Sequence, residues 1–136
     1  MKYILDTNAV SALMRGEASV VATLRGKDKQ DVAVPQPVMA EIAYGIARLP
    51  RSRRKERLRE RFVLIREEMT RVPWDDEVSD RFGTAKAALE RAGTRLEDFD
   101  LALAAHALAC GAVLVTANVR HLGRIPGLSI EDWAKG

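Results

Sequence analysis

The sequence predicts an α/β fold in which a central, mostly parallel sheet of four to five strands carries helices on both faces. Short apolar runs alternate with longer helical patterns along the 136 residues. This alternation is typical of parallel sheets, because each return to the sheet needs a crossover helix. The run that follows Gly111 is continuously apolar, as expected of a strand that helices cover on both sides.

Five segments have the composition of strands. The first is the apolar run Lys2–Leu5, and the second, Asp31–Val34, ends at a proline. Arg71–Val72 is a weak third strand that another proline terminates, and Leu128–Ile130 is a candidate fifth. The clearest strand is Ala112–Thr116. These segments give the four to five strands of the predicted sheet.

Six segments show helical patterns. They are Val10–Met14, Ala18–Arg25, Pro37–Leu49, Ser52–Glu68, Asp76–Arg91 and Asp98–Cys110. Two of them have clear inner stripes, one formed by Val38, Ile42, Ile46 and Leu49 and the other by Leu58, Phe62, Ile65 and Met69. Gly93 and Gly111 stand where C-terminal caps belong, and Thr94–Glu97 matches a capping box ahead of the last helix.

Composition predicts a single domain over residues 1–136. The chain is 47% hydrophobic and 30% charged, as in a soluble globular protein with a core. It has no apolar stretch of membrane-spanning length, and its first residues lack a signal-peptide layout. Its one cysteine, Cys110, favours a reducing cytoplasm and is interpreted as a small buried residue rather than a nucleophile.

Charge is unevenly distributed along the chain, whose net charge is +3. The segment from Arg48 to Arg71 holds ten Lys/Arg and four Glu, a local charge of +6, so the remainder carries −3. A basic segment beside an acidic site suits a polyanion that is cut at a metal ion. The alternative is a solvated helix whose alternating charges pair with one another.

Three acids, Asp6, Glu41 and Asp100, stand in or beside apolar segments far apart in the sequence. Acids are rarely buried without a partner, and a shared divalent cation would supply one. Hard cations such as Mg²⁺ take oxygen ligands, commonly carboxylates, water and substrate phosphate. The carboxyl ends of parallel strands are where ligands gather, so the acids can meet at one crevice. The sequence therefore predicts a metal-dependent enzyme that acts on phosphate esters.

Each acid also has a structural alternative. Asp6 can cap a helix, Glu41 can be a surface residue, and Asp100 can stabilise a helix N-terminus. Thr7 and Asn8 are predicted to orient the Asp6 carboxylate or its waters.

The remaining polar candidates have smaller predicted roles. Asp98 is interpreted as a cap or as a supporting acid, and Thr116 and Asn118 follow the fourth strand at the same crevice. His106 cannot share a helix face with the acid six residues before it, so it is expected to pack or to form a hydrogen bond. His121 is expected in a loop, as a contact residue rather than a ligand.

Four stretches together resemble the acidic-site segments of PIN-domain ribonucleases, and most closely the VapC toxins of toxin–antitoxin pairs. They are Tyr3–Asn8, Val38–Gly45, Asp100–Leu108 and Leu114–Leu122, and the ending Ile125–Trp133 is also similar. The resemblance runs from end to end and implies a PIN-like three-layer α/β/α fold. It implies metal ligands at Asp6, Glu41 and Asp100. The family's fourth acidic position corresponds to Asn118, an amide, which puts a second metal in question.

The resemblance further implies Mg²⁺- or Mn²⁺-dependent endoribonuclease activity. In that mechanism Asp6 and Asp100 hold the principal metal, Glu41 binds a second ion or a metal-bound water, and in-line attack leaves a 5′-phosphate and a 3′-hydroxyl. The implied partners are an RNA substrate, a cognate VapB-like antitoxin and a second copy of the chain in a homodimer. Arginines of the range 48–61 are candidates for gripping either RNA or the antitoxin.

Two rival functions remain open at the level of sequence. A phosphatase or related hydrolase on another α/β sheet usually has a second Asp two residues after the first, but Asn8 stands there. A catalytically weak or inactive PIN module that only binds RNA or protein is opposed by the three intact acids and favoured by Asn118. A non-toxin RNA-processing nuclease is a further alternative within the same chemistry.

Overall fold

The computed structural model describes residues 1–135 and contains one five-stranded sheet. Its strands are β1 (Tyr3–Leu5), β2 (Val32–Pro35), β3 (Thr70–Val72), β4 (Val113–Val115) and β5 (Ser129–Glu131). They lie in the order β3-β2-β1-β4-β5, and all four neighbouring pairs are parallel. The predicted parallel sheet is confirmed, including its weak third strand and its fifth strand.

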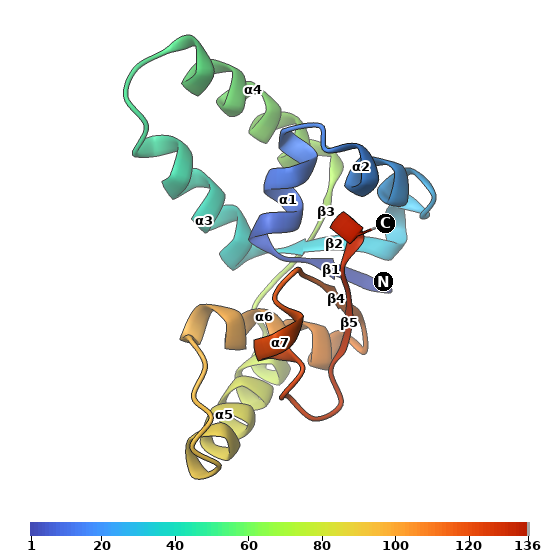
Figure 1. Ribbon diagram of the computed structural model, residues 1–136, viewed down its shortest axis with the longest axis vertical. Coiled ribbons are helices and arrows are strands. Elements are labelled where there is room, and N and C mark those ends of the chain that lie inside the picture. The colour runs from blue at the N-terminus through green and yellow to red at the C-terminus, as the bar shows by residue number, and fades with distance from the viewer. Residues whose placement is uncertain (136) are drawn as a thin grey trace.

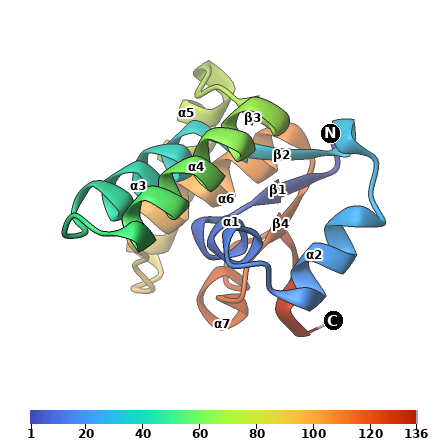
Figure 2. The same ribbon diagram turned by 90° about the horizontal axis from the view of Figure 1, so that it is seen from above.

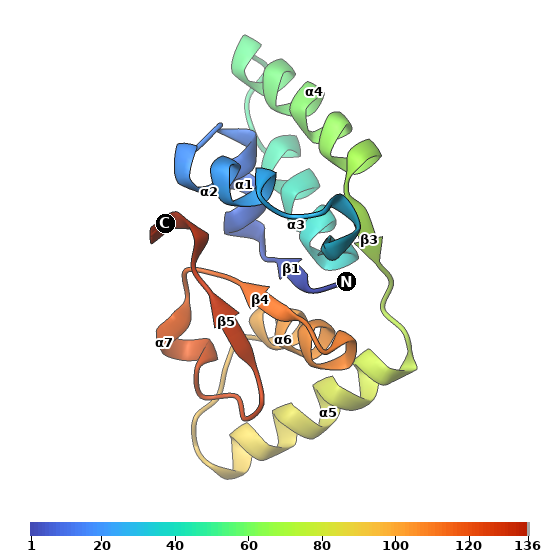
Figure 3. The same cartoon turned by 90° about the vertical axis from the view of Figure 1, so that its right-hand side faces the viewer.

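Helices cover both faces of this sheet. They are α1 (Thr7–Met14), α2 (Ala18–Arg25), α3 (Gln36–Ala47), α4 (Arg53–Glu68), α5 (Asp76–Arg91), α6 (Asp98–Cys110) and the short α7 (Val119–Leu122), with single 3-10 turns at Lys29–Asp31 and Trp133–Lys135. Figures 1 and 3 show α1 to α4 on one side of the strands and α5 and α6 on the other. The three-layer α/β/α arrangement predicted from the sequence is therefore confirmed.

Helices α3 and α4 form an antiparallel pair that extends beyond the sheet, as the view from above shows (Figure 2). Ser52 caps α4 by accepting a hydrogen bond from the Lys55 backbone N–H at 3.1 Å. The Lys55 ammonium group donates to the Leu49 carbonyl at 3.0 Å, and the Arg61 guanidinium donates to the Met14 carbonyl at 2.6 Å. Two cations of the basic segment thus satisfy carbonyls at the C-terminal ends of α3 and α1, where positive charge is favourable.

Helix α6 lies in the core, as its nearly uniform apolar composition predicts. Every residue from Leu101 to Ala107 is buried, and the helix ends at Gly111 with φ of +62°, a left-handed conformation that favours glycine. No helix among residues 1–135 has both the length and the apolarity to cross a membrane.

The predicted capping box at Thr94–Glu97 is wrong. Helix α6 begins at Asp98 with Glu97 in the cap position, and no side chain forms a capping hydrogen bond there. Thr94 could cap only a helix that began at residue 95, but the chain is not helical there. Leu96 instead packs against the hydrophobic core, which places that segment in an irregular connection.

Candidate functional site

The topological switch of the sheet lies between β1 and β4. From β1 the chain first adds β2 and β3 on one side and later returns to add β4 and β5 on the other. Ligands of open α/β sheets bind at such a point, outside the carboxyl ends of the strands. Asp6 directly follows β1 and Thr116 directly follows β4, so both stand at this position.

Asp6 is held rigidly at the start of α1. It is 7% exposed, and its Oδ1 accepts a hydrogen bond from the Ala9 backbone N–H at 2.8 Å. Burial raises its pKa, hydrogen bonds with Thr116 and Ala9 lower it, and the charges of Asp100 and Asp132 raise it further. Asp6 therefore caps α1 and also lies near a second acid, Asp100. Capping alone would lower the pKa of Asp6, so it does not explain why that pKa is raised.

Asp100 approaches the same point from the first turn of α6. Burial raises its pKa, and the negative charges of Glu97 and Glu41 raise it further. The positive influence of His121 and a hydrogen bond with Asn118 oppose this rise. Glu97 is close to Asp100 in sequence, directly before the same helix, whereas Glu41 lies on α3 and is brought near Asp100 by the fold.

One cavity of about 260 Å³ collects these acids. It is lined by Asp6, Thr7, Asn8, Glu41, Glu97, Phe99, Asp100 and Leu103. The structure therefore brings together all three acids that the sequence singled out, with Thr7 and Asn8 beside them. Glu41 is exposed on α3 and borders the cavity from that side.

Glu97 is the acid of this cavity that sequence reasoning missed. It was assigned to a capping box, yet it lines the cavity and is the strongest charged influence on the pKa of Asp100. Its position directly before a buried helix that carries Asp100 was the available signal.

The lining chemistry fits a hydrated divalent cation. Four carboxylates are hard oxygen donors, and the Thr7 hydroxyl is buried without a hydrogen-bond partner among the described residues. Buried hydroxyls normally have partners, so an occupant that supplied one would stabilise the site. Across residues 1–135, no three His, Cys, Asp or Glu side chains are clustered as a ready-made cage. Mg²⁺ commonly takes one or two carboxylates and keeps several waters, which this more open arrangement suits.

Asn118 links the ends of α6 and β4. Its side-chain nitrogen donates to Asp100 Oδ2 at 3.4 Å, and its backbone N–H donates to the Thr116 hydroxyl at 3.0 Å. Its Oδ1 lies 2.9 Å from Nδ1 of His121. His121 was expected in a loop, but it lies in α7, a helix too short to show periodicity in the sequence. His121 is thus linked to Asp100 through Asn118, and its role as a contact residue rather than a ligand stays a prediction.

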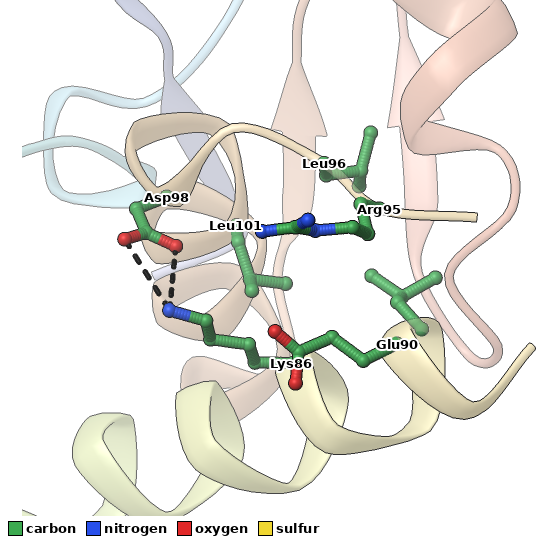
Figure 4. Close-up of a pocket in the computed structure, with 7 residues that line it drawn as sticks. Lys86, Glu90, Arg95, Leu96, Asp98 and Leu101 are labelled. Atoms are coloured by element: carbon green, nitrogen blue, oxygen red, sulfur yellow. Dashed lines mark hydrogen bonds and ion pairs between the residues drawn. The ribbon is translucent and has the colours of Figure 1, made fainter. Parts of the chain in front are cut away.

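Asp98 does not line the cavity of the three acids. Its carboxylate pairs with the Lys86 ammonium group at 3.1 Å, and Figure 4 shows the two side chains turned towards each other between α6 and α5. It borders a separate cavity of about 220 Å³ beside Glu90 and Arg95. The predicted capping role of Asp98 is wrong, because it is the first residue of α6 and forms no cap.

The remaining singled-out residues are structural. His106 is fully buried, its Nδ1 lies 2.9 Å from the Ala102 carbonyl, and its ring packs edge-on against Trp74 at 5.3 Å. This confirms the predicted packing and hydrogen-bonding role. Cys110 is half-buried, and burial together with the nearby Asp75 and Glu77 charges raises the pKa of its thiol. A raised pKa disfavours the reactive thiolate, in keeping with its non-nucleophilic interpretation.

Comparison with known proteins identifies relatives over nearly the whole chain. The family model for the PIN domain matches residues 3–128. A relative named Ribonuclease VapC2, from Rickettsia felis, is 31% identical, with 99% of this chain and 100% of the relative aligned. A tRNA(fMet)-specific endonuclease VapC from Salmonella typhimurium is 27% identical, with 98% of each chain aligned.

Solved structures give the same result. A chain from the crystal structure of VapBC2 from Rickettsia felis, bound to a DNA fragment from their promoter, superposes with a TM-score of 0.86 at 27% identity over 98% of this chain and 99% of that one. A chain from the DNA-bound VapBC of Salmonella typhimurium gives a TM-score of 0.85 at 27% identity, with 98% of each chain covered.

Proposed function

The chain belongs to the PIN-domain family, among its VapC-type ribonucleases, and from this premise we propose that it is a divalent-metal-dependent endoribonuclease and the toxin of a type II toxin–antitoxin pair. The observation that carries the proposal is the cavity at the switch point of the sheet, which Asp6, Glu41 and Asp100 all line. These three side chains are proposed as the metal ligands and catalytic acids, and residues 1–136 as a single PIN domain.

The proposed chemistry is hydrolysis of an RNA phosphodiester bond. A Mg²⁺ or Mn²⁺ ion bound by the acids would supply an activated water and offset the charge that develops on the phosphate. The chain's own residues fix the geometry. Asp6 is held between the Ala9 N–H and the Thr116 hydroxyl, and the Asn118 amide steadies Asp100. Phe99 and Leu103 form the apolar part of the wall, which strengthens electrostatic interactions beside it.

The relatives suggest partners for this site. Two of the matching structures are complexes named VapBC, which supports a cognate VapB-like antitoxin as partner. One relative is named for its specificity towards tRNA(fMet), so transfer RNA is the first substrate pool to examine. We propose a homodimer that acts in the cytoplasm, where RNA and antitoxin are available.

The direct test is cleavage of total RNA and of a transfer RNA pool by purified, antitoxin-free protein. Discrete fragments should appear with Mg²⁺ or Mn²⁺ and disappear with EDTA or in Asp100→Asn. Asp98→Asn is the matched control, since that acid is two residues away and pairs with Lys86 instead. It should retain cleavage.

Absence of cleavage by folded protein with every RNA pool would refute the enzyme assignment. It would favour the alternative of an RNA- or protein-binding PIN module, for which the amide at Asn118 is the specific reason. Cleavage by a protein that has no cognate antitoxin would instead favour a non-toxin RNA-processing nuclease.

A further inference from the structure

A second, larger cavity adjoins the acidic one. It encloses about 540 Å³ and is lined by residues of α1, α3, α4 and the α3–α4 connection. Thr7 and Glu41 line both cavities, so the two cavities are immediate neighbours. We call the larger one the α3 groove. Anything bound in it would lie directly beside the candidate metal-binding acids.

Tyr44 is an exposed aromatic residue in the α3 groove. It follows Glu41 by three residues on α3, which places the two on neighbouring positions of one helix face. Its side chain is 64% exposed, and the Arg48 guanidinium carbon lies 5.9 Å from its ring centroid. Single exposed hydrophobic residues are common on protein surfaces. An exposed ring beside an arginine, within one helical turn of a site acid, is a more specific arrangement.

The floor of the α3 groove is apolar. It is lined by Met14, Ile42, Ile46, Leu49 and Leu58. Gly45 also borders it, and a Cβ built there would meet nothing within 4 Å. The glycine is therefore not required by close helix packing, and its missing side chain leaves this wall of the groove open.

The groove also carries positive charge. Arg15, Arg48 and Arg54 line it. Arg15 pairs with Glu17, but no ion pair among residues 1–135 involves any residue of the basic segment 48–71. The alternating charges of that segment therefore do not neutralise one another as a self-paired helix would. Lys55 and Arg61 cap helices, whereas Arg48 and Arg54 remain directed to the groove.

We propose that the α3 groove binds an unpaired nucleotide of the RNA strand next to the scissile phosphate, with its base stacked on Tyr44 and its phosphate near Arg48 and Arg54. Aromatic rings stack bases, and arginines neutralise the backbone in single-strand binding sites. The apolar floor accepts the flat face of a base, and the shared border at Thr7 and Glu41 brings the adjoining phosphate next to the acids. This inference rests on the proposed ribonuclease function and assigns its substrate groove.

The test uses RNA binding and cross-linking in EDTA, so that neither readout requires cleavage. The probe is a single-stranded oligoribonucleotide carrying 5-iodouridine, and the cross-linked residue is mapped by mass spectrometry. Tyr44→Ala should weaken RNA binding at least about fivefold, and Tyr44→Phe should remain within about twofold of the wild type, because stacking needs the ring and not the hydroxyl. Leu64→Ala is the matched control, since Leu64 is also exposed (56%) but lies outside the groove.

Charge is tested separately through the salt dependence of RNA binding. Arg48→Gln should reduce the slope of log K against log salt by about 0.7 for each phosphate contact it removes. Arg81→Gln, an exposed arginine on α5, should leave the slope unchanged.

Cross-linking at Tyr44 together with weakened binding by Tyr44→Ala would support the proposal. Unchanged RNA binding and cross-linking in Tyr44→Ala would overturn it. If that variant had instead lost affinity for the cognate antitoxin, the groove would be a protein-docking surface and not an RNA site. A wild-type protein that binds and cross-links at Tyr44 but never cleaves would contradict the ribonuclease proposal alone.

Discussion

Replacement of Asp6 separates its capping role from its role at the acidic cavity. The Asp6 carboxylate accepts from the buried Ala9 N–H at 2.8 Å and also interacts with the Thr116 hydroxyl. Asparagine keeps an acceptor oxygen and is an equally good cap, so Asp6→Asn should not lower the free energy of unfolding. It also removes a charge whose pKa burial and Asp100 raise. Alanine removes the acceptor altogether.

The cost of Asp6→Ala follows from these contacts. Loss of the cap costs about 1 kcal/mol, and withdrawing the acceptor from a Thr116 side chain that is 2% exposed costs about a further 1–2 kcal/mol. Because both variants lose the charge, Asp6→Ala should be about 2–3 kcal/mol less stable than Asp6→Asn. Urea denaturation followed by circular dichroism measures both variants under identical conditions.

The RNA-cleavage activities of Asp6→Asn and Asp6→Ala should not follow their stabilities. Both variants should lose at least about tenfold in RNA cleavage, because even residues that only support a metal ligand typically cost about 10- to 100-fold. Asp6→Asn would then be folded, stable and inactive. If Asp6→Asn instead cleaved RNA as well as the wild type, Asp6 would be a helix cap only, and the assignment of the cavity as a metal centre would fail.

Three further substitutions probe the core, the groove and the edge of the site. Burial lowers the pKa of His106 from its ordinary 6.5, so the unfolded chain binds the proton first as pH falls. The free energy of unfolding of the wild type should then fall by up to about 1.4 kcal/mol per pH unit below about pH 6.5. His106→Leu should lack this part of the pH dependence when both proteins are unfolded with urea. Equal pH dependence of the two proteins would contradict a buried, neutral His106. Gly45→Ala should raise the free energy of unfolding by about 0.5–1 kcal/mol, since the position is mid-helix with open space around it, and a loss of stability would show an unrecognised contact. Asn118→Asp replaces a donor to Asp100 by a fifth carboxylate, so it should lower the melting temperature in EDTA and enlarge the rise produced by Mg²⁺. An unchanged Mg²⁺ response would place Asn118 outside the ion's reach.

The sheet was predictable because its strands are short apolar runs bounded by glycine, proline or an acid. Burial confirms this, since Ile4, Leu5 and Leu114 are fully buried in the two central strands. Strand order was not predictable from periodicity, because each strand is compatible with several neighbours. Without that order, the crevice between β1 and β4 could be expected only in general terms.

Short elements and local caps were the weakest predictions. Helix α7 has four residues and no capping hydrogen bond from a side chain, so neither periodicity nor a boundary signal marked it. The capping box failed because the packing of Leu96 in the core outweighed a local pattern at Thr94–Glu97. The same error concealed Glu97 as a cavity acid. At Thr94–Glu97 the tertiary contacts of the chain determine the local structure, and the capping pattern does not.

The acidic cavity and the α3 groove carry opposite charges. The cavity gathers Asp6, Glu41, Glu97 and Asp100, and the pKa values of Asp6 and Asp100 are both raised by burial and by neighbouring acids. Such a cluster repels a phosphate unless a cation lies between them. The adjoining α3 groove has the opposite sign and an exposed ring, so under our proposal it holds an RNA strand independently of the ion. Attraction to the strand and reaction at the phosphate are thus assigned to adjacent but chemically opposed surfaces. Glu41 and Thr7 form the boundary between them, because they alone line both cavities.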